Sequence, residues 1–223
     1  MLSFSNKYNR HMLLSYLKQN KFYIFATIIY LLSLFFVKEM NFLFYNTSDS
    51  PDFSRYFRYL EYNVGIIDYT DSEQGFAYYD IQSIYFYLKN YDLTSINFFV
   101  YLGKSIQEVN FIFFLIGSAG IAKLLSQFNY NRVQILVALI FINFMPMSIA
   151  QRIVFKPEIL AFAIFPWVLV LLEKYFEKSD YWYLFTAGLL SLILFSQKGS
   201  IFAMTIFVLF IYYFVKFLRQ KDK

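Results

Sequence analysis

Apolar side chains along this chain come in long blocks, and polar or charged stretches separate the blocks. The first block covers residues 22–44, and others cover about 110–128, 133–150, 157–173, 182–197 and 200–217. Their lengths approach the ~20 residues that a helix needs to cross a hydrocarbon core about 30 Å thick. The pattern therefore predicts an all-α fold, a polytopic transmembrane helix bundle with about six spans.

One long polar segment, residues 45–108, follows the first block. Most connections in helix bundles have about two to eight residues, so this segment should have structure of its own. Aromatic and apolar residues recur at helical spacing in its stretches DFSRYFRYLEY, YYDIQSIYFYL and INFFVYL. Such amphipathic segments are typical of helices in the membrane interface, where Tyr is favoured. The alternative is an extra span within 76–103, which would bring Asp80 and Lys89 into hydrocarbon at about 2.5–3.5 kcal/mol each.

The charges predict the orientation of the spans. If the spans alternate in direction, 12 of the 20 basic residues share a side with the amino terminus, and the opposite side receives nine of the 15 acidic residues within 45–108. Short basic segments stay in the cytoplasm, so both termini are predicted to be cytoplasmic. The predicted divisions are a cytoplasmic basic segment (1–21), a first span (22–44), an extracytoplasmic acidic loop (45–108), a five-helix transmembrane region (109–218) and a cytoplasmic tail (219–223).

Composition agrees with a membrane protein and narrows the chemistry. Hydrophobic residues make up 59% of the chain, more than the roughly 45–50% of soluble domains. The net charge of +5 comes from cations that flank the spans, so nucleic acid is not the expected partner. The chain has no Cys, and its one histidine, His11, lies in the basic amino-terminal segment, where we expect a surface position. Any chemistry must therefore use carboxylates, Lys, Arg, Tyr or backbone groups.

Small residues interrupt one of the apolar blocks. Gly117 and Gly120 lie three residues apart, with Ser118 and Ala119 between them. Small residues let the backbones of two membrane helices approach closely. We therefore expect a second helix to pack here, rather than a phosphate-binding loop.

Two carboxylates stand directly after the first span. Asp49 and Asp52 occur in the stretch SDSPDF, at the start of the predicted external loop. Carboxylates three residues apart can converge to act as a general base or to hold a divalent cation, the one candidate cofactor and metal that the sequence offers. The alternative is that they only favour a helix amino terminus at Pro51 through the helix dipole.

The predicted topology brings further charges to the same membrane face as Asp49 and Asp52. They lie in two other external connections, and they are Arg152, Lys156, Glu158 and Lys198. Cations beside carboxylates at a lipid-accessible surface suit an anionic lipid headgroup, whose phosphate the cations would hold. For Lys156 and Lys198 the alternative is ordinary snorkelling at helix ends. Glu158 needs a partner at the mouth of a span, such as one of these lysines.

Several of these stretches together resemble the GT-C superfamily of membrane glycosyltransferases. They are the first span, the acidic SDSPDF, the aromatic YYDIQSIYFYL, the span that begins VNFIFFLIG, and the FKPEILAFA entry into a later span. The resemblance implies a polyprenyl-phosphate sugar as donor, a catalytic acid at Asp49 or Asp52, and donor-phosphate contacts at Arg152, Lys156 or Lys198. Because that family has about seven spans and usually more, the chain would correspond to an amino-terminal portion or a truncated member. A bacterial inner (plasma) membrane is the expected location.

A function of another class stays open. The chain could be a non-catalytic membrane subunit or a component of a lipid or polysaccharide transporter. Transport predicts polar residues in mid-span along a pathway, and the sequence offers only Asn143 and Gln197 there. The sugar, the acceptor and the oligomeric state do not follow from the sequence.

Overall fold

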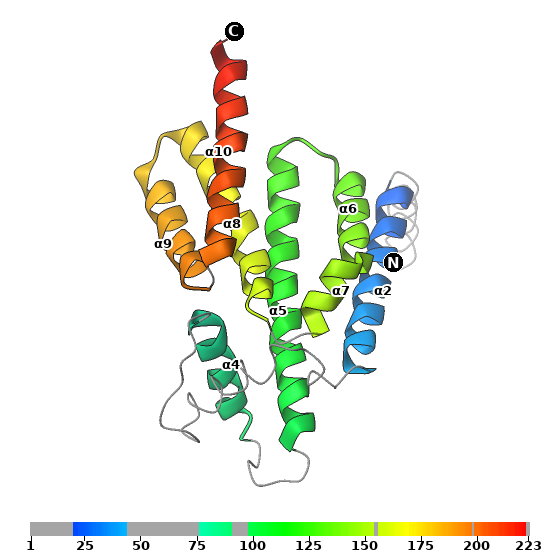
Figure 1. The fold of residues 1–223 in the computed structure, drawn as a ribbon. Coiled ribbons are helices and arrows are strands. Elements are labelled where there is room, and N and C mark those ends of the chain that lie inside the picture. The colour runs from blue at the N-terminus through cyan, green and yellow to red at the C-terminus, as the bar shows by residue number, and fades with distance from the viewer. Residues whose placement is uncertain (1–19, 44–75, 91–97, 154–155, 198, 222–223) are drawn as a thin grey trace, which may run out of the picture.

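The computed structural model describes residues 20–43, 76–90, 98–153, 156–197 and 199–221, and throughout these ranges the regular structure is α-helical, without strands. Figure 1 shows the helices in a bundle with α5 near its centre. Their bounds are α2 (Lys21–Leu43), α4 (Phe76–Leu88), α5 (Phe98–Gln127), α6 (Arg132–Phe144), α7 (Pro146–Ile153), α8 (Glu158–Lys178), α9 (Tyr181–Gln197) and α10 (Gly199–Lys221). The all-α prediction is thus confirmed for the described residues.

The expectation of about six spans is not supported. Within the described residues, two helical segments are long and apolar enough to cross a membrane: Val100–Gln127 in α5 and Glu158–Lys178, which is α8. The other apolar helical stretches are shorter, namely Lys21–Phe36, Arg132–Phe144, Tyr181–Ser196 and Ala203–Phe214. One physical reason is Pro146, which divides the apolar block 133–150 into α6 and α7.

Local sequence explains where several helices begin and end. Asn131 caps α6 in a capping box, because its side chain accepts a hydrogen bond from the Gln134 N–H and the Gln134 side chain accepts one from the Asn131 N–H. Asn129 and Ser179 have left-handed backbone angles (φ 62° and 54°) just after α5 and α8. A residue in this conformation ends a helix and turns the chain.

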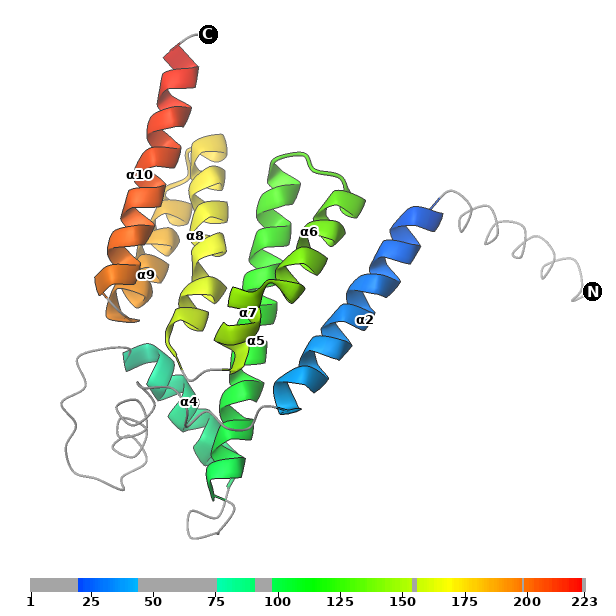
Figure 2. The ribbon, with the colours of Figure 1, turned by 45° about the vertical axis from the view of Figure 1, so that its right-hand side comes forward.

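The helices alternate in direction through the bundle. α5, α8 and α10 run one way, whereas α2, α6 and α9 run the other way (Figures 1 and 2). The α5–α6 and α8–α9 connections therefore lie at one end of the bundle, and α4 packs near the opposite end (Figure 1). α7 and the start of α8 also lie toward the α4 end (Figure 1).

The close contact between α5 and α8 depends on the small residues of α5. A Cβ atom on Gly117 would lie 2.5 Å from the Phe162 ring and 2.6 Å from the Phe162 carbonyl oxygen, and one on Gly120 would lie 2.9 Å from Pro166. The Phe114 and Phe162 rings stack at 5.5 Å, and Trp167 Nε1 donates to the Ile116 carbonyl at 3.0 Å. The predicted small-residue packing surface is confirmed.

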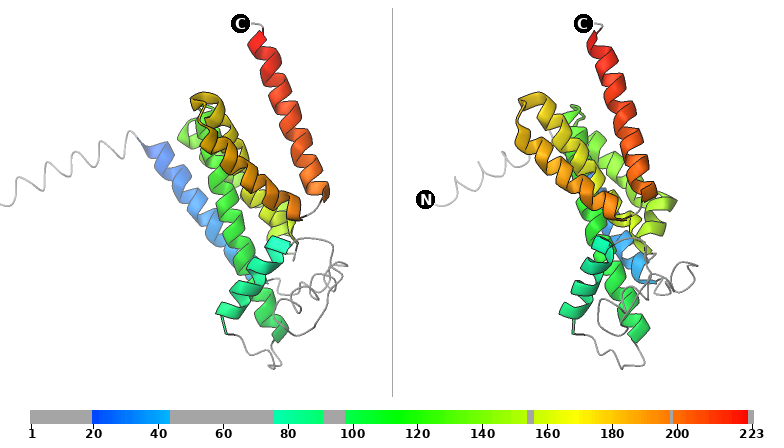
Figure 3. Two further views of the ribbon diagram at one scale, coloured as in Figure 1. Left: turned by 90° about the vertical axis from the view of Figure 1, so that its left-hand side faces the viewer. Right: turned by 60° about the vertical axis from the view of Figure 1, so that its left-hand side comes forward.

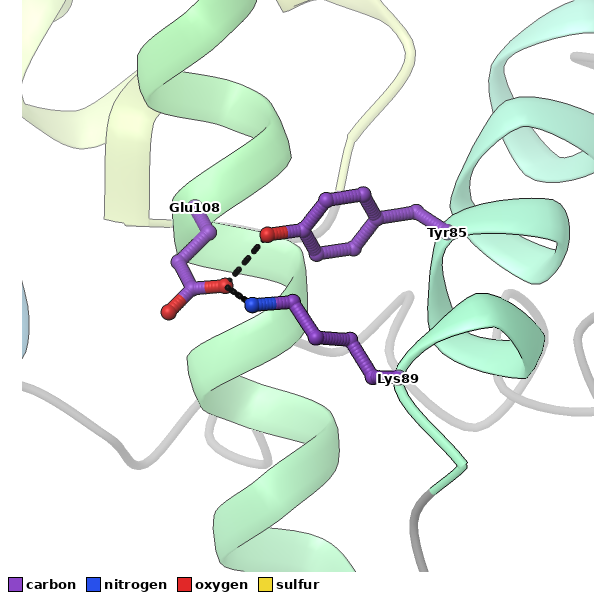
Figure 4. A network of polar contacts seen from close by, with 3 residues as sticks. All are labelled: Tyr85, Lys89 and Glu108. Carbon is purple, nitrogen blue, oxygen red and sulfur yellow. Dashed lines mark hydrogen bonds and ion pairs between the residues drawn. The ribbon is translucent and has the colours of Figure 1, made fainter.

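α4 lies across the amino-terminal part of α5 (Figure 3) and is bonded to it. Tyr85 Oη donates to Glu108 Oε2 at 2.5 Å, and Lys89 Nζ lies 3.1 Å from the same oxygen (Figure 4). The hydrogen bonds of Lys89 with Tyr85 and Glu108 raise the pKa of Lys89. With 13 residues, α4 is about 20 Å long, too short to cross a membrane alone, and Asn90 (φ 49°) follows it in a left-handed conformation. An extra span formed by one continuous helix over 76–103 is therefore excluded.

Candidate functional site

Arg152 is the most deeply buried charged side chain at the α4 end of the bundle. It belongs to the last turn of α7 and has 0% of its surface exposed. Its Nη2 donates to the Asn143 carbonyl at 2.8 Å, and its guanidinium carbon lies 4.3 Å from the centre of the Phe114 ring. The Asn143 carbonyl is in the last turn of α6, where carbonyls lack partners within their helix and carry the negative end of the dipole. Arg152 therefore satisfies an acceptor of α6.

The remaining donors of Arg152 are not satisfied by the described part of the chain. Its Nε and Nη1 have no hydrogen-bond partner there, and it forms no ion pair with a described carboxylate. Burial lowers the pKa of Arg152 to about 10, so the side chain stays cationic at neutral pH. A buried cation costs several kcal/mol unless an anion and hydrogen bonds compensate it. The surroundings of Arg152 are thus suited to an anion with oxygen acceptors.

Asn110 connects α4, α5 and α7 below Arg152. Its Oδ1 accepts hydrogen bonds from Tyr78 Oη at 2.9 Å and from Gln82 Nε2 at 3.2 Å, and its Nδ2 donates to the Arg152 carbonyl at 3.2 Å. All four residues are buried. Burial raises the pKa of Tyr78, so its hydroxyl keeps the proton that it donates. This network holds the backbone of Arg152 in place from the side of α4.

A second contact holds the α6 side of Arg152. Asn143 Nδ2 donates to Ser33 Oγ of α2 at 2.7 Å, and both residues are buried. The Asn143 carbonyl is the group that Arg152 binds. Arg152 is therefore positioned through its backbone by Asn110 of α5 and through its side chain by Asn143 of α6, and residues of α4 and α2 hold these two partners.

Lys156 and Glu158 lie near this network but in different surroundings. The Tyr78 hydroxyl hydrogen-bonds with the backbone of Lys156, and Glu158 is close enough to influence Tyr78 electrostatically. Both side chains are partly exposed. The structure places Arg152, Lys156 and Glu158 at the same end of the bundle, and Arg152 forms no ion pair with Glu158. The predicted role of these residues in holding a headgroup stays a prediction.

Glu158 lines a cavity of about 470 Å³ between α5, α6, α7, α8 and α10. This volume lies within the roughly 300–1,000 Å³ of typical ligand pockets. The other polar side chains of its lining are the hydroxyl residues Ser148 and Thr205, and the apolar lining includes Phe114, Ile121, Ile142, Phe162, Phe165 and Met204. Arg152 is not part of the lining, because it packs against the Phe114 ring.

Half of the predicted site lies outside the described residues. Asp49, Asp52 and Lys198 fall there, so their predicted roles as base, metal ligands and phosphate contact stay predictions. Among the residues that the structure describes, no group of three or more Asp, Glu or His side chains is arranged to hold a metal ion.

Sequence reasoning missed the residues that hold Arg152. Tyr78 and Gln82 are four residues apart and so share one face of α4. Two polar side chains on one face are a sequence signal for a polar partner on a neighbouring helix. Asn110 begins an apolar run and Asn143 lies inside one, and polar residues in such positions usually bond to another helix. A buried carboxylate was also missed: Glu173 of α8 accepts a hydrogen bond from Tyr212 of α10 at 3.0 Å.

Comparison with protein-family models, with curated proteins and with solved structures finds no match for this chain.

Proposed function

We propose that this chain is an integral membrane protein that binds the phosphate of a polyprenyl-phosphate sugar beside Arg152 and transfers the sugar to an extracytoplasmic acceptor, in the manner of a GT-C-like glycosyltransferase. The observation that carries the proposal is the buried Arg152, whose Nε and Nη1 lack partners among the described residues. Phosphate oxygens accept hydrogen bonds from guanidinium in bidentate geometry, and such bonds are among the strongest in proteins.

Membrane insertion rests on α5 and α8 and on what the other helices expose. Both have the length and apolar composition of a span. Large apolar side chains on the outer faces of α2, α9 and α10 are also exposed, among them Phe25, Phe35, Phe185, Leu192, Phe207 and Phe210. Contiguous apolar surface of this kind is typical of lipid contact rather than of a soluble monomer. The alternating helix directions place the start of α2 and the end of α10 toward the end of the bundle away from α4 (Figure 1).

The chemistry proposed for transfer needs a base. A carboxylate accepts the proton of the acceptor hydroxyl as this oxygen attacks the sugar, and the lipid phosphate leaves with the electron pair of the glycosidic bond. We assign the base to Asp52 or Asp49, because these carboxylates follow the first predicted span on the same predicted membrane face as Arg152. The cation of Arg152 would stabilise the negative charge on the departing phosphate.

The test is binding and turnover of a radiolabelled polyprenyl-phosphate sugar by the purified chain in nanodiscs. We expect the wild-type chain to bind the donor and release lipid phosphate, and Arg152→Gln to lose binding by at least about tenfold, since bonds to a charged group contribute about 1.5–3 kcal/mol. Arg132→Gln is the matched control, because Arg132 is exposed at the start of α6. Asp49→Asn with Asp52→Asn should keep binding and abolish release.

Two outcomes would overturn parts of this proposal. Equal donor binding by Arg152→Gln and wild type would remove Arg152 from the donor site. Wild-type binding without release of lipid phosphate would favour the non-catalytic subunit or the transporter component instead.

A further inference from the structure

The cavity beside α8 has a polar end and an apolar end. α5 and α8 run in the same direction, and the stacked Phe114 and Phe162 rings set the level at which they meet. Glu158 precedes Phe162 by about one helical turn, whereas Ile121 and Phe165 lie further along the same direction. From Glu158 to Phe165 the lining rises about 10 Å along the axis of α8. A ligand with a polar head at Glu158 and an apolar chain toward Ile121 therefore matches this cavity.

The negative charge of Glu158 in the cavity lining disfavours binding of anionic headgroups, which are the kind that suit Arg152. Among the lining residues that the structure describes, Glu158 is the one charged side chain. Arg152 is not among the described lining residues, although it stacks on the Phe114 ring, which belongs to the lining. A phosphate or carboxylate head beside Glu158 would meet like charge in apolar surroundings, where repulsion is strong.

The hydrogen-bonding groups of the lining favour a hydroxyl over an ammonium head. A carboxylate accepts hydrogen bonds only, whereas the hydroxyls of Ser148 and Thr205 both donate and accept. A hydroxyl head can donate to Glu158 and accept from a neighbouring hydroxyl, but an ammonium head can only donate. An ammonium would also lose its hydration in an apolar cavity, at a cost of several kcal/mol.

We propose that this cavity binds a lipid alcohol, with its hydroxyl at Glu158 and its alkyl or isoprenoid chain between α5, α8 and α10. The lining of this site does not include Arg152, and the proposal does not depend on the proposed sugar transfer. A chain that enters the cavity removes apolar surface of both the chain and the lining from water or from looser lipid contact. The protein thus has two lipid sites of opposite charge preference.

The test is the binding of a tritiated C15 isoprenoid alcohol to the full chain in detergent, in competition with the amine, carboxylate and phosphate of the same chain length. We expect the alcohol to bind most tightly of the four at this site. Glu158→Gln should weaken alcohol binding by about tenfold, because it removes a charge-assisted hydrogen bond. Arg152→Gln should leave alcohol binding unchanged.

Two further variants locate the chain in the cavity. Ala161→Phe fills the space from the wall of α8, and Met204→Trp fills it from α10, where Met204 lines the cavity but is 73% exposed, so the fold tolerates a larger side chain. Phe207→Trp is the matched control, because Phe207 is exposed on α10 and does not line the cavity. We expect Ala161→Phe and Met204→Trp to abolish alcohol binding, and Phe207→Trp to preserve it.

The proposal is overturned if Glu158→Gln and Met204→Trp both bind the alcohol as wild type does, or if the amine, carboxylate or phosphate competes more strongly than the alcohol. Release of lipid phosphate from the sugar donor, measured on the same preparation, separates this proposal from the proposed function. Alcohol binding that depends on Glu158 without such release would leave the lipid-alcohol site standing and remove the enzyme. Release of lipid phosphate without alcohol binding would support the proposed enzyme and remove the lipid-alcohol site.

Discussion

Arg152 and Glu158 are six residues apart in sequence, yet they face different parts of the molecule. Arg152 is fully buried in a polar network that α4, α5 and α6 supply, whereas Glu158 is partly exposed and lines an apolar cavity. The Phe114 ring contacts both regions. The difference shows that opposite charges at one end of a helix bundle need not pair with each other, because the helix face that carries each charge decides its partners.

The largest effect should come from breaking the α5–α8 contact that both regions share. Gly117→Leu places a side chain where the Phe162 carbonyl stands 2.6 Å from a Cβ position, so the two backbones must separate. We expect a loss of about 3 kcal/mol in the free energy of unfolding and loss of both the phosphate and the alcohol sites. Thermal unfolding in detergent, followed by circular dichroism, measures the loss of stability.

Gly188→Leu is the control for this substitution. A Cβ atom on Gly188 meets nothing within 4 Å, so the same side chain should change stability by less than about 0.5 kcal/mol. Equal melting temperatures for Gly117→Leu and wild type would show that α5 and α8 do not approach as closely as described.

The next effect separates the two regions. Asn110→Ala leaves the Tyr78 hydroxyl, the Gln82 amide and the Arg152 carbonyl without the partner that Asn110 provides. We expect a loss of about 2 kcal/mol and weaker binding of the sugar donor, because buried polar groups without partners cost about 1–3 kcal/mol each. Binding of the lipid alcohol should stay unchanged. An equal loss at both sites would mean that they are one site.

A smaller effect of opposite sign should follow from removing the buried charge. Arg152→Met keeps much of the side-chain volume against Phe114 but removes a cation whose Nε and Nη1 lack described partners. We expect the protein without ligand to gain about 1 kcal/mol of stability while donor binding is lost. A clear loss of stability without ligand would show that an internal group compensates the charge of Arg152.

The smallest effect concerns the contacts of Tyr85 and Lys89, near the carboxyl end of α4, with Glu108 of α5. The hydrogen bonds of Lys89 raise its pKa above the ordinary value of 10.5. The contribution of these contacts to folding stability is therefore fully present below about pH 10.5, and it is lost as the pH rises through the higher pKa of Lys89 in the folded protein. Because Lys89 is partly exposed, Lys89→Met should cost less than about 1 kcal/mol. Melting curves at pH 7 and pH 9 for Lys89→Met and wild type should differ by the same small amount.

The sequence was sufficient for features that depend on local pattern. The apolar blocks predicted helices, and Gly117 with Gly120 predicted the contact with a neighbouring helix that proved to be α8. The same pattern also predicted about six spans, which the structure does not support, because block length says nothing of how Pro146 divides a block into α6 and α7.

The candidate site could be predicted only in part. The charges at Arg152, Lys156 and Glu158 stand out in an apolar chain, which made these residues candidates. The partners of Arg152 did not follow, because Asn110 is 42 residues away and Asn143 contributes its backbone carbonyl, which every residue has. The stacking of Arg152 on the Phe114 ring depends on tertiary packing, which no sequence pattern specifies.

The most direct test of the proposed function is the affinity of the purified chain for a polyprenyl-phosphate sugar, compared between wild type, Arg152→Gln and the exposed control Arg132→Gln. We expect Arg132→Gln to bind as wild type does and Arg152→Gln to bind at least about tenfold more weakly. Equal affinities for all three proteins would contradict the assignment of Arg152 to the phosphate, and with it the proposed function.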